Sequence, residues 1–265
     1  MNLRAWIWFR YALLVGNLLA PVFAVGMTCL GHPIIGFGVG VSIYLALHWA
    51  VFAPTSCWLG PVVSSFAPEK GDEVWITIDD GPDPQDTPAI LDVLRARKAQ
   101  VTFFFIGEKA AQYPDLVRRA AEEGHGIGNH SFSHPAASMW LYPPGAVARE
   151  VDQGRAAILQ AAAITGPLPF RAPAGNKSPF LHGKLAPGER VVAWSARAFD
   201  TCCREPQKVV ARLMRGARPG AIMLMHEGVV ARDGSRLGPQ VLAQLLAELE
   251  KKGLRAVVPE SGSWR

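Results

Sequence analysis

The sequence predicts an α/β domain that follows an N-terminal hairpin of two membrane-spanning helices. Residues 11–68 contain no Asp, Glu, Lys or Arg, whereas charged residues recur from Glu69 to the end of the chain. From that point short runs of β-branched and aromatic residues alternate with segments of helical periodicity, as they do in α/β folds. The chain of 265 residues therefore divides into an anchor, residues 1–68, and a second domain, residues 69–265.

The charge-free run is long enough for two spans, because a membrane helix needs about 20 apolar residues. The Gly-His-Pro segment at 31–33 divides it, so spans are expected at about 11–30 and 34–52. Small residues at the start of the second span should let the two helices pack closely. These residues are Gly36, Gly38 and Gly40.

Basic residues predict the orientation of the hairpin. Arg4 and Arg10 precede the first span, none lies between the spans, and Lys70 follows the second. The positive-inside rule then places both termini, and the second domain, on the cytoplasmic face. A cleaved signal peptide is the alternative, although no A-x-A site ends the first apolar stretch. If the second segment is only re-entrant, the domain lies outside.

Composition excludes several classes of protein. With 49% hydrophobic and 18% charged residues the chain is neither disordered nor a disulfide scaffold. Its charges alternate rather than cluster, so nothing indicates a nucleic-acid partner. The cysteines match neither a disulfide framework nor a metal spacing. They are Cys29, Cys57, Cys202 and Cys203.

The second domain has recognisable strands and helices. Strands are predicted at 73–79, 100–106, 169–170, 190–195, 221–225 and 254–258. Helices are predicted at 87–98, 114–123, 144–164, 206–216 and 238–251. The first helix would have Thr87 as its N-cap and Pro88 at its first position, and the second would stop at Gly124.

Two adjacent carboxylates end the first strand of this domain. The segment Thr77-Ile-Asp79-Asp80-Gly81 combines an apolar strand with Asp79, Asp80 and a turn. Strand ends of this kind are where α/β folds build active sites. Neighbouring carboxylates can take different roles if one binds a metal and the other does not. The alternative is a turn that Asp80 caps.

A histidine pair strengthens the prediction of a metal site. His130 and His134 lie four residues apart, and on a helical turn this spacing aims both rings at one ion. With one carboxylate they would form a three-ligand set with open positions for water and substrate. The alternative is a solvated pair in a loop, and His125 is expected to be structural.

Three further polar residues follow later strands. Arg171 lies in Phe170-Arg-Ala-Pro-Ala-Gly175, where it could hold a carboxylate while the turn aims backbone N–H groups at an oxyanion. Asp200 is an isolated acid just past a strand, and His226 ends one. An ordinary turn with a surface Arg, and a core histidine, are the alternatives.

In this order and spacing the residues resemble the polysaccharide deacetylase family, the NodB-homology domains of carbohydrate esterase family 4. Residues 77–81 look like the family's T-F-D-D-G, and residues 130–134 look like its H-[ST]-x-x-H. The resemblance covers about residues 74–226. It implies a distorted (β/α) barrel with fewer than eight strands, and a catalytic domain at 69–265.

The resemblance also implies roles for individual residues. Asp79 would be the catalytic base, paired with Arg171, and His226 the general acid, oriented by Asp200. The backbone N–H near Ala174 would bind the oxyanion. One divalent ion, zinc or else cobalt, nickel or manganese, would have three ligands. These are Asp80, His130 and His134.

The sequence departs from the family in its fourth motif, D-x-x-D-W. Arg197 stands in place of the first acid and Thr201 in place of the tryptophan, which in relatives forms part of the substrate groove. Ala174 stands where relatives often carry Tyr. These changes leave the implied chemistry intact and alter the pocket.

The implied activity is metal-dependent hydrolysis of the N-acetyl group of an amino sugar in a glycan or lipid-linked saccharide. Two spans on a small domain favour a substrate at the membrane. One alternative is a deformylase or deacetylase of peptidoglycan or exopolysaccharide outside the membrane. Another is a non-catalytic membrane-bound scaffold that binds sugar. The sequence indicates no protein partner.

Overall fold

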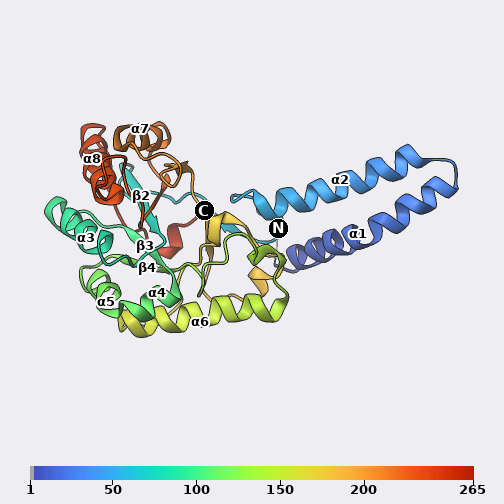
Figure 1. Cartoon of the computed structure of the whole chain (residues 1–265), viewed down its shortest axis with the longest axis horizontal. Coiled ribbons are helices and arrows are strands. Elements are labelled where there is room, and N and C mark those ends of the chain that lie inside the picture. The colour runs from blue at the N-terminus through green and yellow to red at the C-terminus, as the bar shows by residue number, and fades with distance from the viewer. Residues whose placement is uncertain (1–2) are drawn as a thin grey trace.

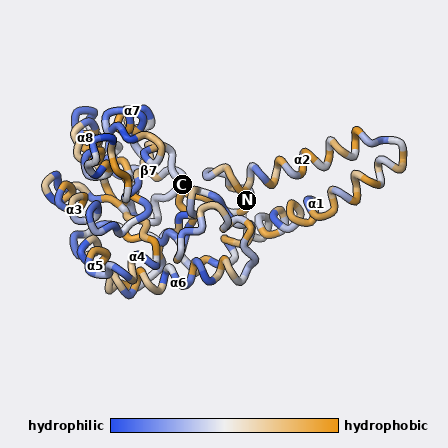
Figure 2. The backbone as a smooth tube through the Cα atoms, in the orientation of Figure 1, coloured by the Kyte–Doolittle hydropathy of each residue, from blue (hydrophilic) through white to orange (hydrophobic). Residues whose placement is uncertain are grey.

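A long helical hairpin projects from an α/β domain in the computed structural model, which describes residues 3–265, with side chains from Trp6 onward (Figure 1). The hairpin consists of α1 (Leu3–Cys29) and α2 (Pro33–Phe52). Both helices are long and apolar enough to cross a membrane, and apolar residues colour much of their length (Figure 2). The first helix begins well before the predicted residue 11. The side chain of Arg4, which entered the prediction of orientation, lies outside the described part.

Close packing within the hairpin depends on one of the three expected glycines. A Cβ at Gly36 would lie 2.8 Å from the Cβ of Met27, so only glycine fits there without displacement. A Cβ at Gly38 or Gly40 would have no neighbour within 4 Å in the described chain, so the expectation of close packing is wrong for these two. Gly38, two residues from Gly36, lies on another face of the helix, whereas Gly40, four residues away, shares the face of Gly36 and still has open space beside it.

A parallel sheet forms the centre of the domain. In spatial order its strands are β4 (Gly126–Asn129), β3 (Thr102–Phe105), β2 (Glu73–Asp79), β7 (Ile222–His226) and β6 (Ala196–Arg197). Two short strands lie elsewhere, β1 (Val62–Val63) beside β5 (Val191–Val192), and β8 (Arg255–Ala256) pairs with the start of β2.

Backbone pairing carries this sheet around into a distorted barrel. Phe170 bridges Asn129 on one side and Val191 on the other, so it links β4 to β5. Within the expected strand at 190–195 only β5 forms, and β6 begins just after the predicted range. The chain bends after β5, which pairs with Phe170 and β1, and continues as β6 against β7.

Helices cover the outside of this sheet, and their bounds agree broadly with the predictions (Figure 1). They are α3 (Asp86–Arg97), α4 (Gly107–Gln112), α5 (Pro114–Glu122), α6 (Pro144–Ala162), α7 (Pro206–Gly216) and α8 (Leu237–Lys251). Single 3₁₀ turns occur at Met139–Leu141, Pro173–Gly175, Leu181–Gly183 and Ser261–Ser263. Neither α4 nor β1 is predicted by the sequence pattern.

The predicted N-cap of α3 is wrong. The helix begins at Asp86, one residue before Thr87, and Asp83 Oδ1 accepts hydrogen bonds from the N–H groups of Gln85 and Asp86. The hydroxyl of Thr87 instead donates to the buried Glu227. Asp83 therefore performs the capping role that the sequence assigned to Thr87.

Alternation along each strand divides the core and places the functional groups. On β2, Val74, Ile76 and Ile78 pack against the outer helices. Trp75 lies in the second cluster, inside the barrel. Since side chains alternate along a strand, Asp79 shares the inner face with Trp75.

The segment that joins the hairpin to β2 belongs to the barrel core. Val62, Val63 and Phe66 are buried in the same cluster as Trp75. Lys177, itself buried, donates from Nζ to the carbonyl oxygens of the residues just after α2. The base of the hairpin is thus held directly against the domain.

Candidate active site and metal centre

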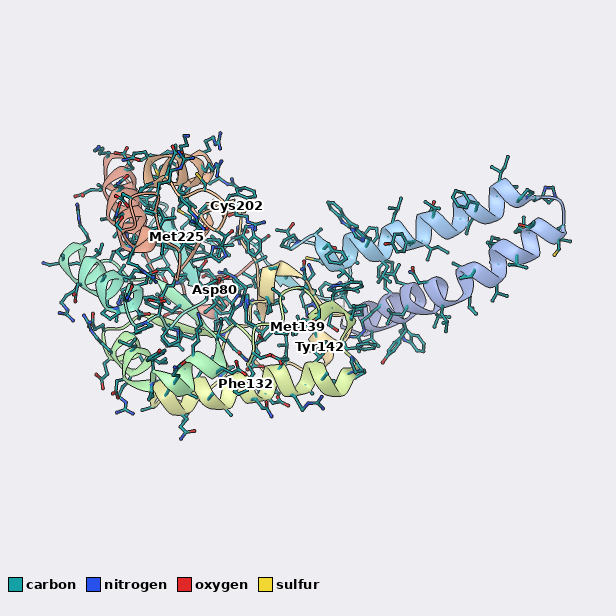
Figure 3. The ribbon with its side chains drawn as sticks, viewed as in Figure 1. Asp80, Phe132, Met139, Tyr142, Cys202 and Met225 are labelled. Carbon is teal, nitrogen blue, oxygen red and sulfur yellow. The ribbon has the colours of Figure 1, made fainter. Side chains whose placement is uncertain are left out.

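Three potential metal ligands converge at the carboxyl ends of β2 and β4. Asp80 follows β2, His130 follows β4 and His134 lies in the next loop, and their ligand atoms all lie within 4.8 Å of one another. Asp80 Oδ1 is 3.1 Å from His134 Nε2 and 3.5 Å from His130 Nε2. Figure 3 shows Asp80 near the centre of the domain.

The two histidines converge through a loop and not through the expected helical turn. Ser131 and His134 both have positive φ, at 67° and 55°. Glu150 on α6 accepts hydrogen bonds from the N–H groups of Phe132 and Ser133, which ties the loop to that helix. The ligand atoms of the two histidines lie close together, but a loop brings them there, so the helical basis of the prediction is wrong.

The donor set fits a divalent cation. The Nδ1 of His130 lies 2.9 Å from the carbonyl oxygen of Arg171, which can only accept, so Nδ1 carries the proton and Nε2 presents its lone pair to the site. Asp80 Oδ1 is buried and accepts no hydrogen bond in the described chain. Burial alone would raise the pKa of Asp80, but the nearby imidazoles of His130 and His134 outweigh it and hold that pKa well below its usual range. An ionised carboxylate and two imidazoles therefore surround one point.

Asp79 is held by Arg171 at the end of β2. Arg171 Nη1 donates to Asp79 Oδ1 at 2.7 Å, and both side chains are almost fully buried. The other donors of Arg171 bind Thr77 and two backbone carbonyls, and its guanidinium lies 4.1 Å from the ring centroid of Phe104. The free Oδ2 of Asp79 lies 3.6 Å from His130 Nε2, on the side of the metal ligands.

His226 and Asp200 form a second paired unit. His226 is the register partner of Asp79 across β7 and β2. Asp200 Oδ1 lies 2.8 Å from His226 Nδ1, and Asp200 Oδ2 accepts from the backbone N–H of His226. Burial alone would lower the pKa of His226, but the hydrogen bond and charge of Asp200, with Asp79 and Asp80 adding to it, raise that pKa to about 9.

The turn after Arg171 presents a free backbone donor. Ala174 has a φ of 54°, and its N–H donates to no other group in the part of the chain that the structure describes. Among the described residues, five of the seven non-glycine residues with positive φ lie in this site or next to one of its residues. They are Asp80, Ser131, His134, Ala174 and Phe199.

One pocket of about 140 Å³ brings most of these groups together. Its lining contains Asp79, Asp80, His130, His134, Ala174, Gly175, Trp194, Arg197, Thr201, Leu224 and His226. The two departures from the family's fourth motif thus lie in the pocket wall. Arg171 and Asp200 act from behind it, each through the residue that it binds.

Some residues of the site were not singled out by the sequence. Lys109 donates from Nζ to the carbonyl of Asp80. Glu150 holds the histidine loop, residues 130–134. No motif marks them, because each lies on a helix remote in sequence. His125 is buried against Phe103 away from the pocket, as expected for a structural histidine.

Comparisons with known proteins agree with this geometry. A sequence model of the polysaccharide deacetylase family matches residues 67–182. A peptidoglycan-N-acetylglucosamine deacetylase of Bacillus cereus is 37% identical over 186 residues, which cover 69% of this chain and 84% of that protein. A chitooligosaccharide deacetylase of Rhizobium leguminosarum is 35% identical over 58% of this chain and 71% of its own length.

A solved structure shares the fold. The crystal structure of a peptidoglycan N-acetylglucosamine deacetylase superposes with a TM-score of 0.64 at 29% identity, covering 74% of this chain and 89% of that one. The shared fold and sequence define a carbohydrate deacetylase of the NodB type. The chain belongs to the polysaccharide deacetylase family.

Proposed function

We propose that this protein is a metal-dependent deacetylase that hydrolyses the N-acetyl group of an amino sugar in a glycan or lipid-linked saccharide. One observation carries the proposal. Three converging ligand atoms lie around one pocket together with a carboxylate paired with an arginine and a histidine paired with a carboxylate. Its relatives bear the names of deacetylases of peptidoglycan and chitooligosaccharides, which supports the same class of substrate.

Asp80, His130 and His134 would hold the ion, and zinc is the ion that we propose. Cobalt, nickel and manganese suit the same imidazole and carboxylate ligands and would compete with it. Bound there, a divalent cation supplies Lewis-acid stabilisation of negative charge on the acetyl oxygen and increases the acidity of water.

The remaining groups would move the protons. Asp79, oriented by Arg171, removes a proton from water as the water oxygen bonds to the acetyl carbon. The N–H of Ala174 donates to the oxyanion that forms. The C–N bond then breaks as His226, held by Asp200, gives its proton to the leaving nitrogen, so acetate and a free amine result.

The test compares the full chain with two variants. Asp79→Asn should lower kcat for acetate release by about 10²–10⁴-fold, the usual contribution of a general base, and leave the metal content at one ion per chain. His130→Ala should lose both metal and activity. Elemental analysis and an acetate assay on a chitooligosaccharide measure these effects. Activity retained in either variant would refute the role assigned to that residue. No ion bound by the wild type after zinc is supplied would favour the non-catalytic scaffold that binds sugar.

The position of the pocket beside the hairpin supports a substrate at the membrane. Gly175 lines the pocket, and a Cβ on it would lie 2.8 Å from Pro54, two residues past α2. Lys177, two residues further on, donates from its backbone N–H to Val51 within α2. A saccharide linked to a lipid would therefore reach the pocket without leaving the membrane surface.

We further propose that α1 and α2 both span the membrane, with both termini and the domain on the cytoplasmic face. Arg4 and Arg10, which precede the long apolar stretch of α1, and Lys70 after α2 support this orientation. A reporter that functions only in the cytoplasm should be active when it is fused to the C-terminus, and a reporter that functions only outside should be inactive there. A reporter active only outside would instead favour the action on peptidoglycan or exopolysaccharide that the names of the relatives suggest.

A further inference from the structure

Three arginines line a groove that adjoins the active-site pocket. The groove has a volume of about 580 Å³, and Arg197, Arg212 and Arg215 contribute to its walls. No Asp or Glu lines it. Figure 3 shows Cys202, which also lines the groove, above Asp80 near the edge of the domain.

None of these three arginines has a carboxylate or other hydrogen-bond acceptor as a side-chain partner within the described chain. They form no ion pair and donate no side-chain hydrogen bond there, and Arg197 Nε is shielded from solvent without an acceptor. Elsewhere on this surface arginines are paired, as Arg95 and Arg119 are with Glu123. Others, such as Arg118 and Arg149, form no ion pair in the described part of the chain either, so the groove is distinguished by three unpaired arginines lining one hollow.

An aromatic ring holds two of the guanidinium groups in place. Phe199 is 48% exposed and has a φ of 54°. Its ring centroid lies 4.6 Å from the guanidinium of Arg197 and 5.9 Å from that of Arg212. Contact with an aromatic face orients a guanidinium while leaving its N–H donors free for another acceptor.

Arg197 connects the groove to the reaction site. It lines the active-site pocket as well as the groove, at the position where the family's fourth motif has an acid. A group bound in the groove and an acetamido group in the pocket would thus belong to the same sugar or to adjacent sugars. The charge reversal at residue 197 lies where it can select the substrate.

We propose that Arg197, Arg212 and Arg215 bind a phosphate or diphosphate group carried by the amino sugar that this enzyme deacetylates. The inference rests on the proposed deacetylase function and specifies its substrate class. Guanidinium groups pair bidentately with phosphate oxygens. Three guanidinium groups, with no Asp or Glu beside them, match the charge of a phosphate ester or diphosphate. A ligand with a single carboxylate would need only one guanidinium group.

A binding experiment tests the groove without reference to turnover. Full-length protein in detergent is titrated calorimetrically with inorganic diphosphate. The Arg212→Gln/Arg215→Gln variant, altered outside the active-site pocket, should bind at least 10-fold more weakly than the wild type. Arg218→Gln, which removes one positive charge from an exposed residue outside the groove, should change Kd less than 2-fold. No binding by the wild type, or equal weakening by both variants, overturns the proposal.

An activity experiment separates the two sources of phosphate. Acetate release is measured on N-acetylglucosamine 1-phosphate, on the same sugar joined by phosphodiester to a polyprenyl chain in micelles, and on neutral diacetylchitobiose. The ratio of kcat/KM for phosphorylated over neutral substrate should fall at least 30-fold in the double variant. Preference for the polyprenyl substrate over the soluble phosphate identifies a lipid-linked saccharide, and equal rates identify a soluble sugar phosphate.

The two proposals fail in different ways. If the wild type hydrolyses neutral and phosphorylated sugars equally well, the groove proposal is overturned and the deacetylase function stands. If no substrate releases acetate, the deacetylase function fails. The diphosphate titration then still decides whether the groove binds phosphate.

Discussion

The proposed acid–base chemistry depends on two pairs of residues, and in each pair a buried partner binds the group that faces the pocket. Arg171 fixes one oxygen of Asp79 and leaves the other free. Asp200 accepts from both the ring and the backbone of His226. Substitution of the buried partner should therefore change both the pH range in which the pocket-facing residue is active and the rate that it supports.

Asp200→Asn should move the alkaline limit of activity to lower pH. His226 gives a proton in the proposed reaction, so turnover is lost as pH rises through its pKa of about 9. Without the negative charge of Asp200 this pKa falls, and the descending limb of kcat against pH should shift down by at least about one unit. The measurement is acetate release between pH 6 and 10. Asp115→Asn, at an exposed residue of α5, should leave the profile in place; an unshifted limb in Asp200→Asn would refute the assigned partnership.

Glu227→Gln should stabilise the protein at alkaline pH. Burial, assisted by the charges of Asp86 and Asp83 and opposed by hydrogen bonds from Thr87 and Asp83, raises the pKa of Glu227 from 4.5 to about 8. The folded state therefore binds more protons than the unfolded state between these values, and wild-type stability falls as pH rises through that window.

The glutamine variant keeps the acceptor for Thr87 and has no carboxyl group to ionise. Its free energy of unfolding should match that of the wild type near pH 4.5 and exceed it by up to about 5 kcal/mol at pH 9. Thermal unfolding followed by near-UV circular dichroism at several pH values provides the measurement. Parallel pH dependences for the two proteins would contradict the assignment.

At the scale of elements, helix α6 approaches the histidine loop, residues 130–134, closely and positions it. A Cβ on Gly154 of α6 would lie 2.5 Å from Asn129 Oδ1 and 2.8 Å from the backbone of Ser131. Asn129 also donates from Nδ2 to the carbonyl of Val151 on the same helix. Helix α6 therefore holds the histidine loop by contact as well as by the hydrogen bonds of Glu150.

Gly154→Ala should destabilise the domain and weaken metal binding together. The methyl group has no space, and overpacking of this kind costs about 1–3 kcal/mol and moves the backbone that carries His130. Gly145→Ala is the matched control on α6, because its nearest neighbour is the mobile end of Arg149 at 3.9 Å. It should be neutral or stabilising by up to about 1 kcal/mol. Chemical unfolding and zinc titration of both variants test this; equal effects of the two substitutions would show that the close approach is unimportant.

The sequence predicts which residues meet at the candidate site better than it predicts the strands and helices that carry them. Asp79, Asp80 and His226 end apolar strands, and parallel strands bring such ends to one edge whatever their exact lengths. By contrast β4 has the sequence Gly-Ile-Gly-Asn, which lacks a strand pattern, and it forms because β3 and Phe170 pair with it. Asp83 and Thr87 are equally good caps in sequence. Only the position of Glu227, 140 residues after Thr87, decides between them.

At the scale of the whole molecule, the hairpin and the domain are one folded unit. The carbonyls after α2 accept from Lys177, whose pKa is lowered by burial to about 8. The backbone between the hairpin and β2 then forms β1 inside the barrel core. The predicted domain boundary, placed between residues 68 and 69 where the charge-free run ends, falls within this core. The charge pattern does not separate the two parts there, because the core segment and the membrane segment are both apolar.

A fragment of residues 69–265 should therefore fail to fold stably, whereas one of residues 53–265 should fold. The shorter fragment lacks Val62, Val63 and Phe66, each more than 90% buried. Burying one such side chain contributes roughly 1.5–3 kcal/mol, so their combined loss approaches the whole stability of a typical domain, about 5–15 kcal/mol. It also leaves the buried ammonium of Lys177 without its two acceptors. Near-UV circular dichroism on heating and zinc content distinguish the fragments: residues 53–265 should melt cooperatively and bind one ion, and cooperative melting of residues 69–265 at a similar Tm would show that β1 contributes little to the barrel.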